Sequence, residues 1–141
     1  MDYDVIIVGA GGAGLAAAVA ATTAGARVLV LEAGRRPGGS TAMSGGVVWA
    51  AGTALQRAEG IDDNAAAQAA YYLTLNQYKV DPALIRRLCE GSAPVVEWLV
   101  SLGVTFPASN LYVSGVDGIR RGHRATRHGA EIAEALEGAL A

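Results

Sequence analysis

The residues of this chain whose types and spacing suit chemistry are six small ones, Gly9-Ala10-Gly11-Gly12-Ala13-Gly14. An apolar run at 5–8 precedes them and an alanine-rich stretch follows, which predicts a turn from a strand into a helix. In such a turn Gly9 permits the tight bend, Gly11 lets the backbone approach a pyrophosphate, and Gly14 lets the helix pack on the strand. The helix N-terminus would offer its N–H groups and positive dipole end to phosphates. The pattern therefore predicts a dinucleotide site.

An acidic residue follows at the spacing that this pattern requires. Glu32 closes a second apolar run at 28–31 and lies 18 residues after Gly14. Its carboxylate suits the hydroxyls of an adenosine ribose and would repel a 2′-phosphate, which disfavours an NADP-type ligand despite the neighbouring Arg35 and Arg36. A glycine-rich turn without a ligand is the alternative, and it leaves Glu32 without a role.

The elements that must position these residues form one short unit. We expect a strand at 4–8, a helix from Gly12 to about Ala24 and a strand at 27–31, both strands fully buried and parallel with a right-handed crossover. The predicted fold class is α/β, a Rossmann-like βαβ unit with a parallel sheet, followed by helices. Those helices are expected from the Asp62-Asp63-Asn64 cap to about Gln77, from Asp81-Pro82, from Ser92 and Pro94 to Gly103, and from Gly129 to Leu140, with an extended segment at 110–116.

Residues 33–53 change character and are expected to form a loop. Glycine and hydroxyl residues dominate its middle part, at 38–46, so backbone amides can face a ligand. Because the loop leaves the carboxyl end of the second strand, where open α/β sheets bind ligands, a ligand-binding loop is favoured over a flexible surface loop.

Composition limits the class of protein. The 141 residues suit a single domain, and a net charge of −2 excludes a strongly basic nucleic-acid binder. No apolar run is long enough for a transmembrane segment, and no room for a signal peptide precedes the first strand, so a cytoplasmic location is expected. The only cysteine, Cys89, is expected to be buried on a helix, and no metal site is predicted.

Two further groups of residues left alternatives open. The basic residues near the end of the chain form either a solvated loop or a surface that steers an anion or contacts a pyrophosphate: Arg120, Arg121, His123, Arg124, Arg127 and His128. Three tyrosines, Tyr71, Tyr72 and Tyr78, suit helix packing better than an aromatic platform for a ligand.

Several segments together resemble the FAD-dependent oxidoreductases of the fumarate reductase and 3-ketosteroid dehydrogenase superfamily. They are the stretch from Asp4 to Ala18 with Val30-Leu31-Glu32-Ala33, the segment 38–49, the segment 94–104, and Arg121-Gly122-His123-Arg124. The resemblance covers essentially the whole chain and implies the N-terminal, incomplete portion of a single FAD-binding domain at 1–141. The final helical pattern also stops without a capping signal, which suggests truncation.

The resemblance implies roles for particular residues. The expected cofactor-binding residues are Gly9, Gly11, Gly12, Ala13, Gly14, Glu32, Ala33, Gly39, Ser40, Thr41, Ser44, Gly45 and Gly46. Because 38–46 contains no histidine that could bond to the flavin, noncovalent FAD is expected. No catalytic residue can be assigned, and the chain alone is expected to be inactive.

The implied activity of the parent protein is hydride transfer to or from a C–C or C=C bond next to an activating group. The partners would be a small-molecule substrate, of the ketosteroid, fumarate or urocanate kind, and an electron donor or acceptor. Two alternatives stay open: a non-enzymatic nucleotide-binding remnant and an NAD-dependent dehydrogenase domain.

Overall fold

The computed structural model describes residues 2–140, which form two compact units. The first unit contains residues up to 46, 102–104 and 125 onward, and the second contains 47–101 and 105–124.

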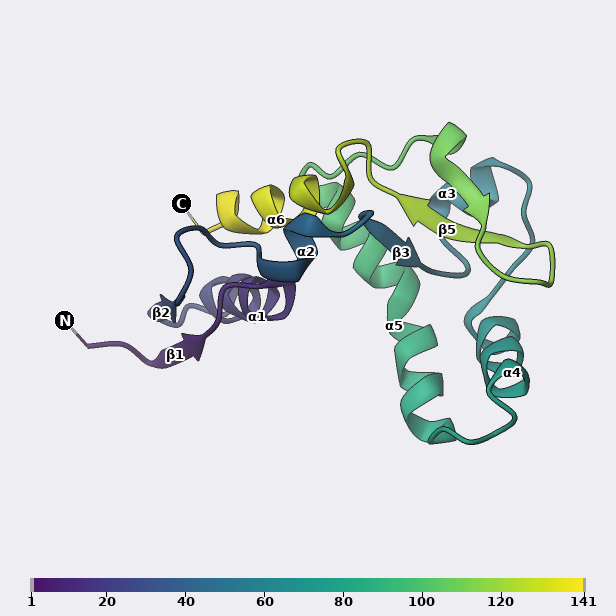
Figure 1. Cartoon of the computed structure of the whole chain (residues 1–141), viewed down its shortest axis with the longest axis horizontal. Coiled ribbons are helices and arrows are strands. Elements are labelled where there is room, and N and C mark those ends of the chain that lie inside the picture. Colours follow the sequence, from purple (N-terminus) through teal and green to yellow (C-terminus); the bar gives the residue numbers. More distant parts are fainter. Residues whose placement is uncertain (1, 141) are drawn as a thin grey trace. The chain divides into compact units, whose positions relative to one another are not determined.

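The first unit is built on the predicted βαβ motif. Strand β1 (Val5–Val8) pairs in parallel with β2 (Val28–Leu31), in register from Val5 opposite Val28 to Val8 opposite Leu31, and helix α1 (Gly12–Thr23) connects them. Two further helices, α2 (Gly39–Met43) and α6 (His128–Gly138), pack on each other, and α6 also packs on α1 (Figure 1). The α/β class with a parallel sheet is thus confirmed.

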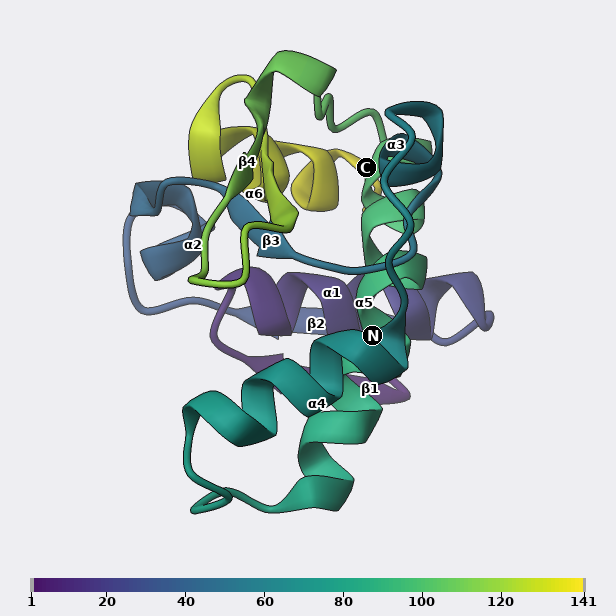
Figure 2. The ribbon, with the colours of Figure 1, turned by 90° about the vertical axis from the view of Figure 1, so that its right-hand side faces the viewer.

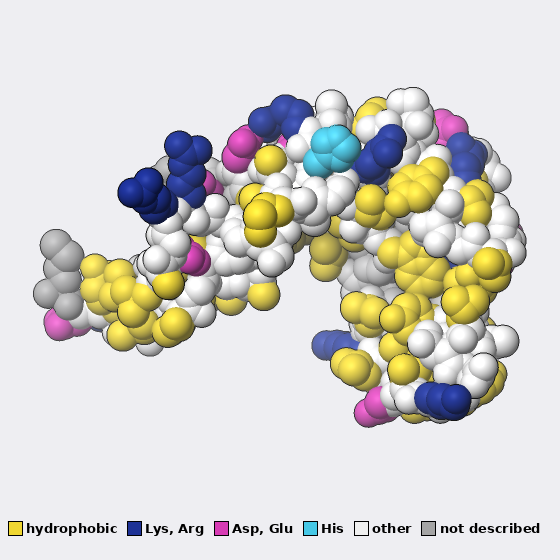
Figure 3. All heavy atoms as spheres, viewed as in Figure 1, with side chains coloured by type: hydrophobic (Ala, Val, Ile, Leu, Met, Phe, Trp, Pro, Cys, Tyr) yellow, Lys and Arg dark blue, Asp and Glu magenta, His cyan; other side chains and the backbone are white. Residues whose placement is uncertain are grey.

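The prediction that both strands are fully buried is wrong for this chain. Helix α1 covers one face of the two-stranded sheet with Leu15, Ala18 and Val19. The opposite face stays open, because no described element packs on it. Ile6 is 60% exposed and Val8 83% exposed, and hydrophobic side chains gather there on the surface (Figure 3).

The second unit joins a small antiparallel sheet to a pair of helices. Its strands are β3 (Val47–Trp49), β4 (Leu111–Val113) and β5 (Arg120–Arg124), in the order β3-β5-β4. Helices α3 (Ala54–Ala58), α4 (Ala65–Leu75) and α5 (Pro82–Ser101) and the short 3₁₀ helix η1 (Ala108–Asn110) complete it. Helices α4 and α5 lie side by side around Ala69, Leu73, Ile85 and Cys89 (Figure 2), so Cys89 is buried on a helix as predicted.

The helix predicted to begin at Ser92 is instead the second half of α5, which continues through Pro94. Proline lacks an N–H and removes one hydrogen bond from a helix. The buried side chains Ile85, Cys89, Val96 and Leu99 nevertheless fall on one face of a single helix. Burial of that continuous face outweighs the lost bond.

Two segments contain regular structure, one that was predicted to be a loop and one for which a solvated loop was an open alternative. The stretch 33–53 holds α2, whose small residues pack closely on α6, and β3, which finds its partner β5 far along the chain. The basic stretch at 120–124 is the central strand of the antiparallel sheet rather than a solvated loop. Composition alone did not reveal these pairings because each partner is distant in sequence.

No helix of residues 2–140 has the length and apolar character that a bilayer span requires. Within the same residues, no group of three or more His, Cys, Asp or Glu side chains is arranged to hold a metal ion.

Candidate functional site

The glycine-rich turn at 9–14 is held at the end of β2. The N–H of Gly9 donates to the carbonyl oxygen of Leu31 over 2.7 Å, and Gly9 adopts a φ of 97°, a conformation that favours glycine. A Cβ on Gly14 would lie 1.9 Å from the carbonyl oxygen of Gly9. Gly14 is therefore required for α1 to pack on the turn at Gly9, whereas the sequence predicted that glycine is needed for packing on the strand itself.

The reasons that require glycine at Gly9 and Gly14 do not apply at Gly11. Its φ is −75°, which any residue can adopt, and a Cβ built on it meets no atom within 4 Å. Neither backbone conformation nor packing within the chain requires a glycine there. Gly11 is the N-cap of α1 and has no side chain to cap it, so open space lies beside the positive end of a helix. A helix N-terminus of this kind is favourable for a bound anion.

The segment at 38–44 lies directly against this turn. The N–H of Gly38 donates to the carbonyl oxygen of Ala10 over 2.7 Å, and Gly38 and Gly11 form a parallel β-bridge. A Cβ on Gly39 would lie 3.3 Å from the Cα of Gly11, so the two backbones approach closely. The Thr41 hydroxyl accepts from the N–H of Gly12 over 3.1 Å. The two glycine-rich segments of the sequence thus form one surface.

Glu32 connects the end of β2 to the same turn. Its carboxylate accepts from the N–H of Ala10 and from that of Gly34, each over 2.7 Å. These two backbone donors hold the pKa of the Glu32 carboxyl below its ordinary value, so it is ionised at neutral pH. A carboxylate has acceptor sites beyond two, so it can still receive hydroxyl donors. A pocket of about 260 Å³ lies beside it, with Ala10 and Leu15 in its wall.

The other residues that were predicted to bind the cofactor differ in their exposure and in their contacts. Ala33, Ser40 and Gly45 are exposed, whereas Gly46 is buried. A Cβ on Gly46 would lie 2.2 Å from the carbonyl carbon of His128, so Gly46 is required by packing against the start of α6. The Ser44 hydroxyl donates to the Thr41 carbonyl over 2.8 Å, and the Ser44 carbonyl accepts from the N–H of Gly129 over 3.1 Å.

The basic residues near the end of the chain are divided between the two units. Arg120, Arg121, His123 and Arg124 belong to the second unit, and Arg127 and His128 to the first. Arg121 is 1% exposed and donates from Nε and Nη2 to Asp63 over 2.7 and 2.9 Å. Its Nη1 donates to Asp117. Arg121 is therefore engaged within the protein and is not available to steer an anion.

The sequence patterns did not predict the buried interactions of two residues, Asp63 and His123. Asp63 was predicted only as part of a helix cap, but Asn64 caps α4 by accepting from the N–H of Ala67 over 2.9 Å, and Asp63 pairs with Arg121. His123 is fully buried, with Nδ1 2.8 Å from the Arg121 carbonyl oxygen and Nε2 2.8 Å from the Thr53 hydroxyl. The alternation of Arg121 and His123 in an extended segment was the only signal in the sequence that could have indicated that they share one face.

Comparison with known proteins identifies this arrangement. The family model described as "FAD binding domain" matches residues 4–140. The chain belongs to this FAD-binding family. Its cofactor is accordingly FAD, as the sequence predicted.

Members of the family with related sequences are flavin-dependent reductases and dehydrogenases. The chain is 39% identical over 102 residues to a urocanate reductase of Eggerthella lenta, covering 72% of this chain and 17% of the relative. It is 38% identical over 125 residues to an NADH:fumarate oxidoreductase of Klebsiella pneumoniae, covering 87% of this chain and 13% of the relative. The FAD-binding chain thus spans less than a fifth of each of these two relatives.

Solved structures agree with the sequence comparison. A 3-ketosteroid-Δ4-(5α)-dehydrogenase from Rhodococcus jostii RHA1, in complex with 4-androstene-3,17-dione, superposes with a TM-score of 0.86 at 30% identity. The match covers 98% of this chain and 35% of the dehydrogenase. The resemblance to the fumarate reductase and 3-ketosteroid dehydrogenase superfamily is confirmed.

Proposed function

We propose that the protein to which this chain belongs is an FAD-dependent oxidoreductase that transfers hydride to or from a C–C or C=C bond beside an activating group. The related proteins named above are all reductases, oxidoreductases or dehydrogenases, which supports this reaction class. Bound FAD supplies the hydride chemistry itself. The substrate class includes ring ketones and fumarate-like or urocanate-like acids, with a separate electron donor or acceptor.

The observation that carries the proposal is the space beside Gly11. A glycine stands there with ordinary backbone angles and nothing within 4 Å of its missing Cβ, at the uncapped start of α1. In the proposal, the turn of Gly9, Gly11, Gly12, Ala13 and Gly14 holds the pyrophosphate of FAD.

The other assigned residues extend this binding site on both sides. Glu32 and Ala33 would contact the adenosine ribose, since the Glu32 carboxylate keeps acceptor sites beyond its two backbone bonds. Along the second segment, Gly39, Ser40, Thr41, Ser44, Gly45 and Gly46 would line the path toward the flavin. These residues bind and orient FAD, and none is proposed to transfer a proton.

We also propose that FAD is held noncovalently and that residues 1–141 are the N-terminal portion of one FAD-binding domain. No histidine occurs at 38–46, but the Nδ1 of His128 lies 3.3 Å from the Gly45 carbonyl oxygen. An imidazole is thus close to this loop. Acid precipitation of the protein distinguishes noncovalent from covalent attachment of FAD. Flavin in the supernatant supports noncovalent binding, and flavin that stays with the protein pellet contradicts it.

The decisive experiment uses the longer parent protein. We expect a purified sample to show flavin absorbance and to be reduced by an artificial electron donor, and then to be reoxidised by one member of a substrate panel. The panel contains fumarate, urocanate and 4-androstene-3,17-dione. A parent protein that binds flavin and reacts with no C=C or ring-ketone substrate would contradict the reaction class and favour a non-enzymatic binding protein.

A further inference from the structure

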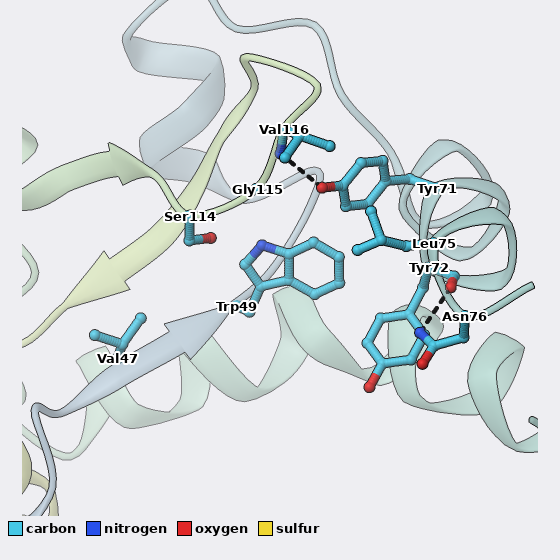
Figure 4. Close-up of a pocket in the computed structure, with 9 residues that line it drawn as sticks. All are labelled: Val47, Trp49, Tyr71, Tyr72, Leu75, Asn76, Ser114, Gly115 and Val116. Atoms are coloured by element: carbon cyan, nitrogen blue, oxygen red, sulfur yellow. Dashed lines mark hydrogen bonds between the residues drawn. The ribbon is translucent and has the colours of Figure 1, made fainter.

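A pocket of about 540 Å³ opens on the second unit, and the proposed FAD site uses none of its residues (Figure 4). Its walls come from β3, from α4 and from the turn after β4. Trp49, Tyr71 and Tyr72 supply three aromatic rings, and Leu75 and Val116 supply aliphatic surface. This volume lies within the range of about 300–1,000 Å³ that small-molecule sites occupy.

The aromatic walls are fixed by contacts within the unit. The Trp49 ring centroid lies 5.9 Å from that of Tyr71 and 5.7 Å from that of Tyr72, and both pairs are tilted. The Arg121 guanidinium lies 5.6 Å from the Trp49 centroid and 5.3 Å from that of Tyr71, in cation–π geometry. The Tyr71 hydroxyl accepts from the N–H of Val116 over 2.8 Å, as Figure 4 shows. These contacts order the pocket before any ligand enters, which lowers the entropic cost of binding.

The charges around the pocket select against an anion. The residues that line it are all uncharged, and the nearest cation in these contacts, Arg121, is 1% exposed and already bonded to Asp63 and Asp117. One guanidinium with two carboxylates leaves a net negative charge behind the aromatic wall. A dicarboxylate would find no free positive partner there and would lose hydration.

The polar groups on the rim offer hydrogen bonds to a neutral oxygen. Ser114 contributes a hydroxyl, and Figure 4 shows the indole nitrogen of Trp49 on the ring edge toward Ser114. An indole N–H is a donor only, and a hydroxyl can donate as well. Flat apolar surface with donors at one edge suits a ring compound that carries a carbonyl or similar acceptor oxygen.

We infer that this pocket binds a flat, uncharged ring compound with an acceptor oxygen. The inference rests on the proposed function only in taking that compound to be the substrate. Among the proposed substrates, the inference therefore favours ring ketones over dicarboxylates.

The test measures binding to the chain by tryptophan fluorescence. The chain has two tryptophans, so Trp98→Phe leaves Trp49 as the only reporter. In this background we expect 4-androstene-3,17-dione to change the Trp49 emission saturably and fumarate to leave it unchanged. Ser114→Phe, which fills the rim, should weaken binding of the ring ketone at least about tenfold. The control Val113→Phe, on an exposed neighbouring side chain outside the pocket, should stay within about twofold.

A second variant tests the charge argument and covers the case in which Ser114→Phe does not fold. Leu75→Arg, at a side chain that is 55% exposed, places a cation on the wall and should weaken ring-ketone binding while allowing fumarate to bind. Equal binding of fumarate and the ring ketone to the unmodified pocket would overturn the inference. So would ring-ketone binding that neither variant changes, or no ring-ketone binding by folded chain. FAD binding is read separately from flavin absorbance, so a chain that loses FAD but binds the ring ketone contradicts the proposed function alone.

Discussion

The Glu32 carboxylate accepts a hydrogen bond from the backbone N–H of Ala10 over 2.7 Å, which joins the end of β2 to the glycine-rich turn. The second oxygen of the same carboxylate accepts from the N–H of Gly34. Glu32 therefore has a structural role in positioning the turn in addition to its proposed contact with the ribose. Its replacement is expected to affect both.

Replacement of Glu32 provides the first prediction. Glu32→Ala in the FAD-binding parent should raise the dissociation constant for FAD at least about tenfold, because an ionised acceptor is lost. Glu32→Gln is the matched control. Its amide oxygen can keep the bond to Ala10, so the loss should be smaller. Flavin titration followed by fluorescence measures both, and an unchanged affinity in Glu32→Ala would contradict the assignment.

Gly11 and Gly14 are expected to respond differently to the same substitution. Gly11→Ala adds a Cβ that meets no protein atom, so the thermal unfolding midpoint should hardly change while FAD binding is weakened. Gly14→Ala places a Cβ 1.9 Å from the Gly9 carbonyl oxygen, so it should lower the midpoint even without FAD. Thermal unfolding of both variants with and without FAD distinguishes the two roles. A Gly11→Ala protein that keeps its full FAD affinity would count against a pyrophosphate at this position.

The buried ion pair of the second unit should be sensitive to loss of one partner. Asp63→Asn leaves the guanidinium of Arg121, which is 1% exposed, without its bidentate carboxylate, and is expected to cost about 3–5 kcal/mol of stability. Urea unfolding of the chain measures this loss. The surface pair Arg127–Glu134 is the control, since Glu134→Gln should change stability by less than about 1 kcal/mol. If the two variants lost similar amounts of unfolding free energy, burial of the ion pair would not determine the loss.

His123 is expected to make stability depend on pH. Burial lowers the pKa of His123 from its ordinary value of 6.5. Below that value the unfolded chain binds a proton that the folded chain excludes, so this stability is present above pH 6.5 and is lost as the pH falls toward the lowered pKa. As the pH falls, urea unfolding should show a steeper decrease in the free energy of unfolding for the unsubstituted chain than for the His123→Gln variant. Identical slopes would mean that His123 does not titrate differently on folding.

The sequence by itself determined the βαβ unit and its ligand class, since these depend on local patterns. Gly9, Gly14 and Glu32 lie within one short stretch, and each is explained by a turn, a close packing contact or a strand end that neighbouring residues define. The hydroxyl-rich segment was predicted to face a ligand, but its hydrogen bond from Gly12 to Thr41 connects residues 29 positions apart. Local composition specified the residue types there and not their partners.

Only the tertiary structure decided the environments of Arg121, His123 and Asp63. In sequence they are charged or titratable residues in polar stretches, which favours a solvated loop or a helix cap. In the fold, β5 is placed between β3 and β4, and burial forces Arg121 to pair with Asp63, 58 positions away. Helix α4 is likewise held to β3 by a long-range contact, since the Gln68 side chain donates to the Trp49 carbonyl oxygen, and this brings Tyr71 and Tyr72 toward Trp49 to form the aromatic pocket. Desolvation depends on which distant segments cover a side chain, and no short-range pattern in the sequence records that.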